Sequence, residues 1–225
     1  MSWLVWVFFV FDRIYLLSFH FRYKMKLMHL PMKAAPMSDI PAIYPKILAK
    51  SKEIGFTMPS DLYIGSLLKT LMLSKPGGNF LEIGTGIGLS LAWMVEGLGE
   101  KESLISIDND PALTAIAEQF FGQDARLRVL CDDGRSWIKS YSGAPFDLIF
   151  ADAWPGKYSE LEETLSLLKM GGFYVIDDMD VQPNWPEGHG ENVKQLIATL
   201  ESREDLALCK MNWSTGLVVG VKTGH

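Results

Sequence analysis

Several features that mark special classes of protein are scarce or missing in this chain. It has two cysteines among 225 residues, Cys131 and Cys209, and their spacing matches neither a metal-binding pair nor a disulfide framework. Its net charge is −6, so it lacks the basic surplus expected of a protein that binds nucleic acid. Internal repeats and low-complexity tracts are missing too. These absences favour a globular protein of a reducing compartment, and we expect it in the cytoplasm.

An uninterrupted apolar run of membrane-spanning length is also missing. A span needs about 20 mostly apolar residues, and the aromatic-rich first 24 residues are interrupted by Asp12 and Arg13. The positive residues Arg22, Lys24 and Lys26 come after the apolar run, whereas a signal peptide has positive charge in front of it. We therefore predict an apolar and linker extension over residues 1–39, with no stable membrane span. It is either the product of an upstream start codon or a membrane-associated segment, and it precedes one domain over residues 40–225.

What the chain does have is enough apolar sequence for one α/β core, with 48% hydrophobic and 21% charged residues. Its most informative stretch is Phe-Leu-Glu-Ile-Gly-Thr-Gly-Ile-Gly-Leu-Ser at residues 80–90. The stretch predicts the end of a buried strand, a tight glycine turn and then a helix over residues 89–98. Glycines let a ligand approach the backbone, and a helix N-terminus offers free N–H groups. The pattern therefore predicts a nucleotide-like ligand.

Two details argue against a dinucleotide. The third glycine of the dinucleotide fingerprint would fall at Leu89, and Glu82, two residues before the first glycine, would repel a pyrophosphate. An acid at this place suits a cationic or amine-bearing ligand. The stretch resembles motif I of the class I S-adenosylmethionine-dependent methyltransferases. That resemblance implies that the cofactor is held by residues of this loop, namely Glu82, Gly84, Thr85, Gly86, Gly88 and Ser90.

The rest of the chain alternates predicted helices and strands. Helices are expected over 40–54, 61–73, 111–121, 159–168 and 191–202, and strands over 104–108, 126–131, 146–151, 173–176, 206–211 and 216–221. This alternation favours a parallel sheet, and a closing antiparallel pair distinguishes the methyltransferase sheet from the dehydrogenase sheet. We expect a Rossmann-like class I methyltransferase fold. It would have a seven-stranded, mostly parallel sheet, helices on both faces and a C-terminal antiparallel strand pair.

Polar residues at strand ends supply the other cofactor candidates. Asp108 ends the second strand, where an acid can accept both ribose hydroxyls, and Asn109 follows it. The resemblance implies that an acid after the third strand faces the adenine amine, with Asp133 preferred over Asp132. In small O-methyltransferases the segment before the second helix borders the cofactor, which makes Met58 a candidate contact. A loop methionine that packs on the core is the alternative for Met58.

Three carboxylates follow two strands that we expect to be adjacent: Asp152, Asp177 and Asp178. Clustered carboxylates repel one another unless they are protonated or bridged by a cation, and oxygen ligands suit Mg²⁺ or another hard divalent ion. The arrangement resembles the catechol and caffeoyl-CoA O-methyltransferase group, whose metal gathers two vicinal hydroxyl oxygens. We therefore predict these three residues as metal ligands. The alternative is a set of caps and acceptor-pocket acids without a metal.

The sequence departs from that group at two positions. Asp178 stands where the group has asparagine, and Pro155 stands where it has a lysine, the nearest lysine being Lys157. We predict Lys157 and Asp152 as catalytic residues, with Lys157 as a general base or as an anchor for the acceptor oxygen. Asp152 is also a candidate contact of the cofactor. A solvated Lys157 in a plain turn is the alternative. An aromatic acceptor site would be lined by tryptophans, namely Trp154, Trp185 and Trp213.

The predicted function is methyl transfer from S-adenosylmethionine to a hydroxyl of a small acceptor, aromatic or otherwise hydroxylated, with or without a divalent ion. The run from 183 to 189 is similar to bacterial predicted O-methyltransferases with undefined acceptors. Three alternatives stay open: a nucleotide-sugar or dinucleotide oxidoreductase, a non-catalytic S-adenosylmethionine-binding module, and a metal-independent N-methyl or aminopropyl transferase. The expected partner is a small molecule and not a nucleic acid, and a homodimer is left open.

Overall fold

The structure is a computed structural model that describes residues 39–182 and 185–224. The chain divides into two units, Met1–Asp39 and Ile40–His225. The predictions made for the N-terminal extension therefore lie outside the described residues, except for Asp39, and stay predictions. Within the described part of the chain, no helix is long and apolar enough to cross a membrane.

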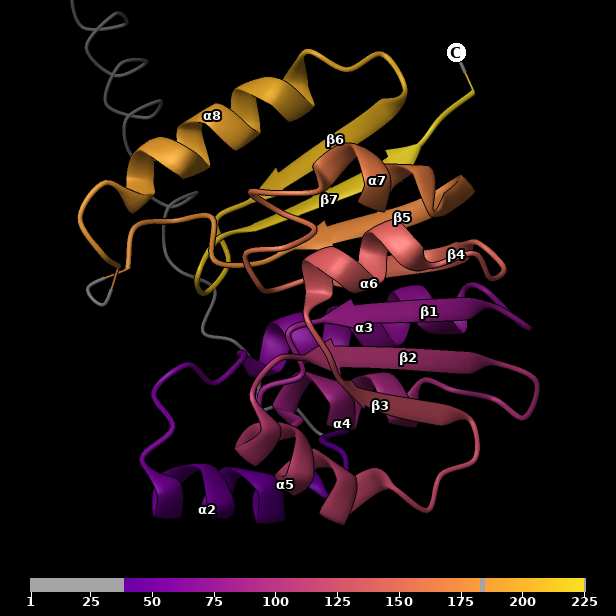
Figure 1. The fold of residues 1–225 in the computed structure, drawn as a ribbon, viewed down its shortest axis with the longest axis vertical. Coiled ribbons are helices and arrows are strands. Elements are labelled where there is room, and N and C mark those ends of the chain that lie inside the picture. Colours follow the sequence, from indigo (N-terminus) through magenta and orange to yellow (C-terminus); the bar gives the residue numbers. More distant parts are fainter. Residues whose placement is uncertain (1–38, 183–184, 225) are drawn as a thin grey trace, which may run out of the picture. The chain divides into compact units, whose positions relative to one another are not determined.

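Seven strands form a single sheet in the order β3-β2-β1-β4-β5-β7-β6 (Figure 1). The strands β1 to β5 are parallel, and β7 is antiparallel to both of its neighbours, β5 and β6. This topology confirms the predicted mostly parallel sheet with a C-terminal antiparallel pair. The strands are β1 Asn79–Ile83, β2 Ser103–Asp108, β3 Leu127–Cys131, β4 Phe146–Ala151, β5 Leu168–Ile176, β6 Leu206–Met211 and β7 Leu217–Lys222.

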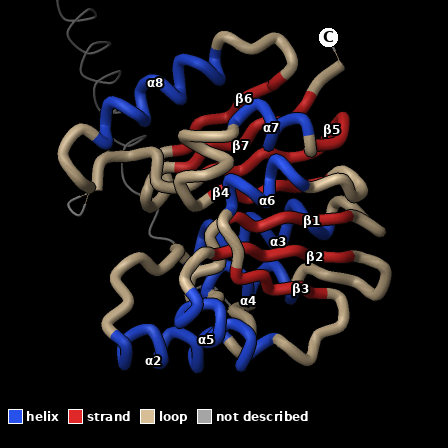
Figure 2. Tube along the Cα trace, viewed as in Figure 1, coloured by secondary structure: helices blue, strands red, loops and turns tan. Residues whose placement is uncertain are grey.

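Helices cover both faces of this sheet (Figure 2). In Figure 1, α3 and α4 lie behind the sheet and α6 and α7 lie in front of it. Because β1 pairs with both β2 and β4, the order of the parallel strands reverses beside β1. Ligands of open α/β sheets bind at the carboxyl ends of the strands at such a reversal. The helices are α2 Tyr44–Ile54, α3 Leu62–Leu73, α4 Leu89–Glu96, α5 Pro111–Phe121, α6 Gly134–Ser140, α7 Leu161–Ser166 and α8 His189–Glu201.

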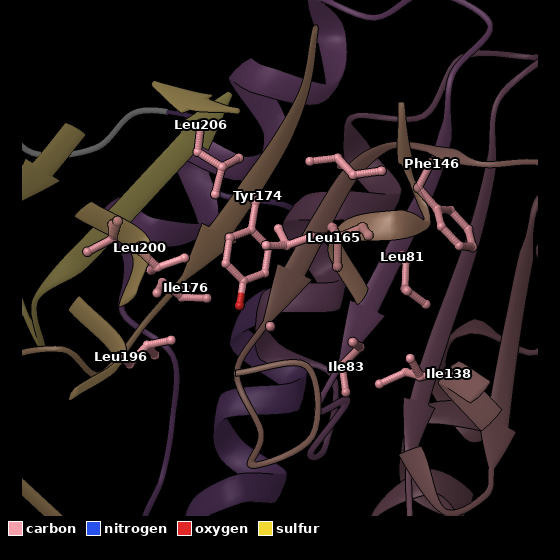
Figure 3. Packing of buried hydrophobic residues seen from close by; sticks show 14 of the residues in the cluster. Leu81, Ile83, Ile138, Phe146, Leu165, Tyr174, Ile176, Leu196, Leu200 and Leu206 are labelled. Atoms are coloured by element: carbon pink, nitrogen blue, oxygen red, sulfur yellow. The ribbon is translucent and has the colours of Figure 1, made fainter. Parts of the chain in front are cut away.

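The core on the α6–α8 side of the sheet forms because alternate strand residues face it. Leu81 and Ile83 of β1 belong to this core, together with side chains from the helices, such as Leu165 of α7 and Leu196 of α8. Figure 3 shows Tyr174 of β5 in the middle of the cluster, with its hydroxyl at the edge of the apolar side chains. By the alternation of a strand, Phe80 and Glu82 face the opposite side, where α4 packs.

The other core depends on a close approach between α3 and α4. Gly65 of α3 is buried against the indole of Trp93 of α4, and a Cβ at this glycine would lie 2.2 Å from Trp93 Cδ1. Trp93 in turn meets Tyr44 of α2 edge-on, with ring centroids 6.2 Å apart. A small residue at position 65 therefore allows the two helices to pack below the glycine loop.

Several element boundaries agree with the sequence pattern, and the reasons are local. The strand over 146–151, the strand over 206–211 and the helix over 111–121 are confirmed. Asp110 caps the helix by accepting hydrogen bonds from the amides of Ala112 and Leu113. Asp61 caps α3 by accepting a hydrogen bond from the Tyr63 amide. The first helix begins at Tyr44, later than predicted, with Pro45 in its first turn.

The structure corrects other boundaries. The sequence pattern does not reveal α6, which starts at Gly134 directly after an acid-rich turn. The helix expected over 159–168 is shorter, because Glu160 has a left-handed φ of 53° and the chain enters β5 at Leu168. The strand expected over 173–176 begins earlier, so Gly171 and Gly172 lie inside β5, whose pairing with β4 shifts register between Phe146 and Leu148. The helix expected from 191 begins at 189.

Because Gly65 packs against Trp93, we expect a glycine-to-alanine substitution at this helical position to destabilise the protein, the opposite of its usual effect. Alanine normally stabilises a helix by about 0.5–1 kcal/mol relative to glycine. Here the new methyl group would overlap the indole, so we expect Gly65→Ala to lower the free energy of unfolding by about 1–3 kcal/mol. Urea denaturation measures the change. Thr70→Ala at an exposed position of the same helix is the control and should change stability by less than about 0.5 kcal/mol. A stabilised Gly65→Ala protein would contradict this packing.

Candidate active site

The glycine loop between β1 and α4 has the shape that its sequence predicts. Gly84, Gly86 and Gly88 all have positive φ, at 106°, 50° and 94°. A Cβ at Gly84 would lie 2.8 Å from the backbone oxygen of Asp152, and one at Gly88 would lie 2.9 Å from the ring of Phe121. These two glycines therefore let the loop pack against the β4 end and against α5. The loop places the N-terminus of α4 at the carboxyl edge of the sheet.

A buried hydrogen-bond network stands beneath this loop. Glu82 is fully buried and accepts hydrogen bonds from the hydroxyls of Ser90 on α4, at 2.6 Å, and Ser106 on β2. Ser106 Oγ also shares a hydrogen bond of 2.6 Å with Thr85 Oγ1. Three residues predicted to contact the cofactor, Glu82, Thr85 and Ser90, thus have partners inside the protein. Burial raises the pKa of Glu82 to about 7, against the lowering effect of the two serine hydroxyls.

Asp108 joins the end of β2 to the glycine loop. Its Oδ2 accepts the Gly86 amide at 2.8 Å, and its Oδ1 accepts the Asp110 amide at 3.0 Å. The side chain borders a cavity of about 190 Å³, and the carboxylate has further lone pairs for a ligand hydroxyl. The cavity lies at the C-terminal ends of β1, β2 and β4 and is lined by Ile83, Gly84, Ile107, Asp108, Asn109, Asp133, Gly134, Ala153, Trp154 and Pro155.

The two acids after β3 occupy different places. Asp133 lines the cavity and caps α6, because its Oδ2 accepts the Ser136 amide at 3.1 Å and the Ser136 hydroxyl at 2.7 Å. These hydrogen bonds hold the pKa of Asp133 below its usual range. Asp132 is exposed and accepts the Asp133 amide instead, and it is not part of the cavity wall. The preference for Asp133 over Asp132 thus agrees with the cavity lining.

The segment before α3 reaches the glycine loop through a residue that sequence reasoning passed over. Met58 is 67% exposed and does not line the cavity. Phe56, two residues earlier, lies so close to the loop that a Cβ at Gly86 would be 3.2 Å from its ring. Its position directly after the helix-ending Gly55 was the available signal.

Lys157 lies inside the protein, which excludes a solvated lysine in a plain turn. Its side chain is 4% exposed, and its Nζ donates a hydrogen bond of 2.5 Å to the backbone oxygen of Asp177. Burial lowers the pKa of Lys157, while the charges of Asp152, Asp178 and Asp177 oppose that shift. The Pro155–Gly156 turn therefore returns this lysine to the carboxylates, although it stands two residues later than in the catechol-type pattern.

The three carboxylates predicted as metal ligands interact electrostatically, and two of them, Asp177 and Asp178, accept hydrogen bonds from the protein. Asp177 Oδ1 accepts the Thr215 hydroxyl at 2.5 Å and the Asp178 amide at 2.6 Å. Asp178, with a φ of 59°, accepts the indole N–H of Trp185 at 2.8 Å. Burial raises the pKa of Asp177 to about 6, against its hydrogen bond from Thr215. Burial and the neighbouring Asp177 likewise raise the pKa of Asp152.

These residues do not fit a divalent ion. Among the described residues, no group of three or more histidine, cysteine or acidic side chains is placed to hold a metal. One oxygen each of Asp177 and Asp178 accepts a hydrogen bond from a donor of the protein. The buried ammonium of Lys157 interacts electrostatically with all three carboxylates. A dication would be repelled by that ammonium. The structure thus does not assemble the metal site predicted from Asp152, Asp177 and Asp178.

Aromatic rings connect the cavity to Lys157. Trp154, at the cavity wall, lies against Tyr158 with centroids 4.9 Å apart, and the Tyr158 ring is 5.1 Å from Lys157 Nζ. The Tyr158 hydroxyl hydrogen-bonds His189 Nε2 at 3.1 Å, and Trp185 packs on the same imidazole with centroids 4.6 Å apart. Two of the tryptophans predicted for the acceptor site, Trp154 and Trp185, belong to this cluster. Among the described residues, Trp213 makes no ring contact with this cluster.

Comparison with known proteins identifies relatives for this arrangement. Residues 81–179 match a family model described as a methyltransferase domain. A Mycobacterium leprae protein named "Putative O-methyltransferase" is 29% identical over 140 residues, which are 60% of this chain and 62% of the relative. A Mycolicibacterium smegmatis relative with a similar name is 30% identical over 118 residues, 50% of this chain and 56% of the relative. The chain thus spans about three fifths of the length of these relatives.

Solved structures share the fold. The O-methyltransferase TomG of Streptomyces achromogenes, in complex with S-adenosylmethionine, matches with a TM-score of 0.72 at 20% identity, covering 89% of this chain and 95% of that chain. The Bacillus cereus O-methyltransferase in complex with S-adenosylhomocysteine matches with a TM-score of 0.70 at 17% identity, covering 88% and 96%. The resemblance to class I methyltransferases is confirmed, and so is the Rossmann-like methyltransferase fold.

The raised pKa of Glu82 makes stability depend on pH. In the folded protein the pKa is about 7, above the ordinary value of 4.5. Its contribution is therefore complete below about pH 4.5 and is lost as the pH rises through about 7, a loss of roughly 3 kcal/mol at most. Glu82→Gln removes this titration. We expect the free energy of unfolding of the variant, relative to wild type, to rise between about pH 5 and about pH 8 in urea denaturation.

Glu100→Gln, at an exposed position in the loop before β2, is the control and should leave the pH dependence unchanged. Parallel pH curves for wild type and Glu82→Gln would show that the Glu82 carboxyl titrates normally, which would contradict its placement in the buried network.

Proposed function

We propose that this chain transfers a methyl group from S-adenosylmethionine to the hydroxyl of a small aromatic acceptor. The observation that carries the proposal is the cavity beside the glycine loop, where Asp108 and Asp133 stand on the wall and Trp154 leads to the buried Lys157. The family model and the named relatives support the reaction class. The rings around His189 favour an aromatic acceptor.

The cofactor would lie along the carboxyl ends of β1 and β2. Asp108 would accept hydrogen bonds from the ribose hydroxyls, with Asn109 beside it, and Asp133 would face the adenine amine. The backbone at Gly84 and Gly86, where positive φ values favour glycine, would face the methionine part of the ligand. Glu82, Thr85 and Ser90 act here by holding the loop, since their polar atoms bond to one another and to Ser106.

The acceptor would bind between Trp154 and the end of β4. A lone pair of its hydroxyl oxygen attacks the methyl carbon, the carbon–sulfur bond breaks, and its electron pair stays on sulfur to give S-adenosylhomocysteine. The hydroxyl proton passes to the carboxylate of Asp152 and from there to water. The protein contributes alignment of the two reactants and exclusion of water at the reacting atoms.

Turnover tests the reaction class. The full chain is incubated with S-adenosylmethionine and a panel of monophenols, catechols and aromatic amines, and S-adenosylhomocysteine is quantified. We expect formation of S-adenosylhomocysteine with hydroxylated acceptors and none above background with the amines. Turnover of amines alone would identify an N-methyltransferase. Cofactor binding without turnover of any acceptor would favour the non-catalytic binding module.

Asp108 provides the test of the cofactor position. Asp108→Asn keeps one oxygen for the Gly86 amide but loses the charge that would meet the ribose hydroxyls. A hydrogen bond to a charged group contributes about 1.5–3 kcal/mol, so we expect S-adenosylhomocysteine to bind about 10–100-fold more weakly by calorimetry. Glu100→Gln, ahead of the same strand at the opposite edge of the sheet, should bind as wild type does. An affinity of Asp108→Asn within twofold of wild type would contradict this position.

A further inference from the structure

The turn that carries Lys157 is held in place by the core. The hydroxyl of Tyr174 on β5 donates a hydrogen bond to the backbone oxygen of Gly156. Gly156 has a φ of 80°, and a Cβ there would lie 2.6 Å from Ile83 Cδ1. The Gly156 amide in turn donates to the Ser159 oxygen at 2.8 Å. This turn therefore has little freedom to move, and it directs the next side chain, Lys157, into the protein.

The surroundings of Lys157 explain how a lysine can be buried here. An ammonium taken from water needs compensation by opposite charge and by hydrogen bonds. Lys157 has an acceptor in the Asp177 backbone oxygen and interacts electrostatically with the carboxylates of Asp152, Asp177 and Asp178. The converse also holds, because three neighbouring carboxylates need a cation or protons to offset their repulsion. The ammonium and the carboxylates therefore stabilise one another.

The N–H donors of the ammonium that the protein leaves unused suggest a chemical role. An ammonium carries three N–H donors, and one of them is used by the Asp177 oxygen. The ammonium lies beside the Tyr158 ring, and this ring in turn contacts Trp154 on the cavity wall. A positive charge at this place can stabilise negative charge that develops on an acceptor oxygen.

We infer that the ammonium of Lys157 is the resident cation of this site in place of a divalent metal, so that the acceptor needs one hydroxyl group and not a vicinal pair. The inference rests on the proposed function for its acceptor and extends it to a substrate class. A metal that chelates two oxygens selects catechol-like acceptors, whereas a single ammonium meets a single oxygen. The fitting acceptor is therefore a monophenol or another aromatic compound with an isolated hydroxyl.

Metal binding tests the inference without any acceptor. The full chain, saturated with S-adenosylhomocysteine, is titrated with Mn²⁺ up to millimolar concentration, and bound Mn²⁺ is followed by calorimetry and by loss of the free-ion paramagnetic signal. We expect no saturable binding to wild type. Lys157→Met removes the ammonium and leaves the three carboxylates, so we expect saturable Mn²⁺ binding and a Tm that rises with added Mg²⁺.

Two further variants act as controls. Lys157→Arg keeps the charge and should stay without Mn²⁺ binding. Lys169→Met removes a lysine from an ion pair with Asp147 at the start of β5, outside the carboxylate cluster, and should also behave as wild type does. Saturable Mn²⁺ binding to wild type that is lost in Asp178→Ala would overturn the inference. A folded Lys157→Met that neither binds Mn²⁺ nor gains Tm with Mg²⁺ would overturn it as well. If Lys157→Met fails to fold, the wild-type and Lys157→Arg titrations still decide.

The activity arm separates this inference from the proposed function. With a monophenol and a catechol that differ by one hydroxyl, we expect comparable kcat/KM values and no more than a twofold effect of a chelator. Lys157→Met should lose about 100-fold or more in kcat, as expected for removal of a group that stabilises a developing oxyanion. Turnover of catechols alone, abolished by the chelator, would overturn the inference and leave methyl transfer intact. Absence of turnover with every acceptor would instead reject the proposed function.

Discussion

The buried carboxyl group of Glu82 joins three elements, β1, β2 and α4, beside the cavity at the carboxyl edge of the sheet. Its oxygens accept hydrogen bonds from Ser106 on β2 and Ser90 on α4, while Glu82 itself belongs to β1. In the parallel pairing of the two strands, Glu82 stands directly opposite Ser106. An unpaired carboxyl group in the core would cost several kcal/mol, so the glycine loop above it must hold both serines in position. The acid of the glycine motif is thus a structural centre as well as a sequence signal.

The surroundings of Lys157 depend on a second constraint, the turn between β4 and α7. Tyr174 holds the Gly156 oxygen from the neighbouring strand, and the left-handed conformation at Gly156 lets the turn approach Ile83 without overlap. Lys157 enters the protein as a result and interacts electrostatically with the carboxylates at the ends of β4 and β5. Because β4 lies between β1 and β5, this charged cluster stands next to the glycine loop. One sheet edge therefore carries both halves of the candidate active site.

Local sequence signals predicted the parts of the fold in which neighbours along the chain make the structure. The apolar run of β4 and the Asp110–Pro111 start of α5 were predictable, because alternation, burial and capping are properties of short segments. The elements that differ depend on distant partners. The strand β5 begins already at Leu168, because this residue, just after α7, pairs with Phe146 of β4. The short α6 begins where Asp133 caps it at the edge of the cavity.

The sequence by itself determined the glycine loop, the acids at the strand ends and the order of helices and strands, because each is written in residue types at short spacing. Only the tertiary structure decided what these groups do to one another. In the fold, Glu82, Thr85 and Ser90 point inward and bond to partners within the protein. Phe56 lies close to the glycine loop, whereas Met58 is exposed. The fold also buries Lys157 among carboxylates that come from different strands. Burial and charge compensation arise between residues that are far apart in the chain, so the spacing of residues along a short segment does not predict them.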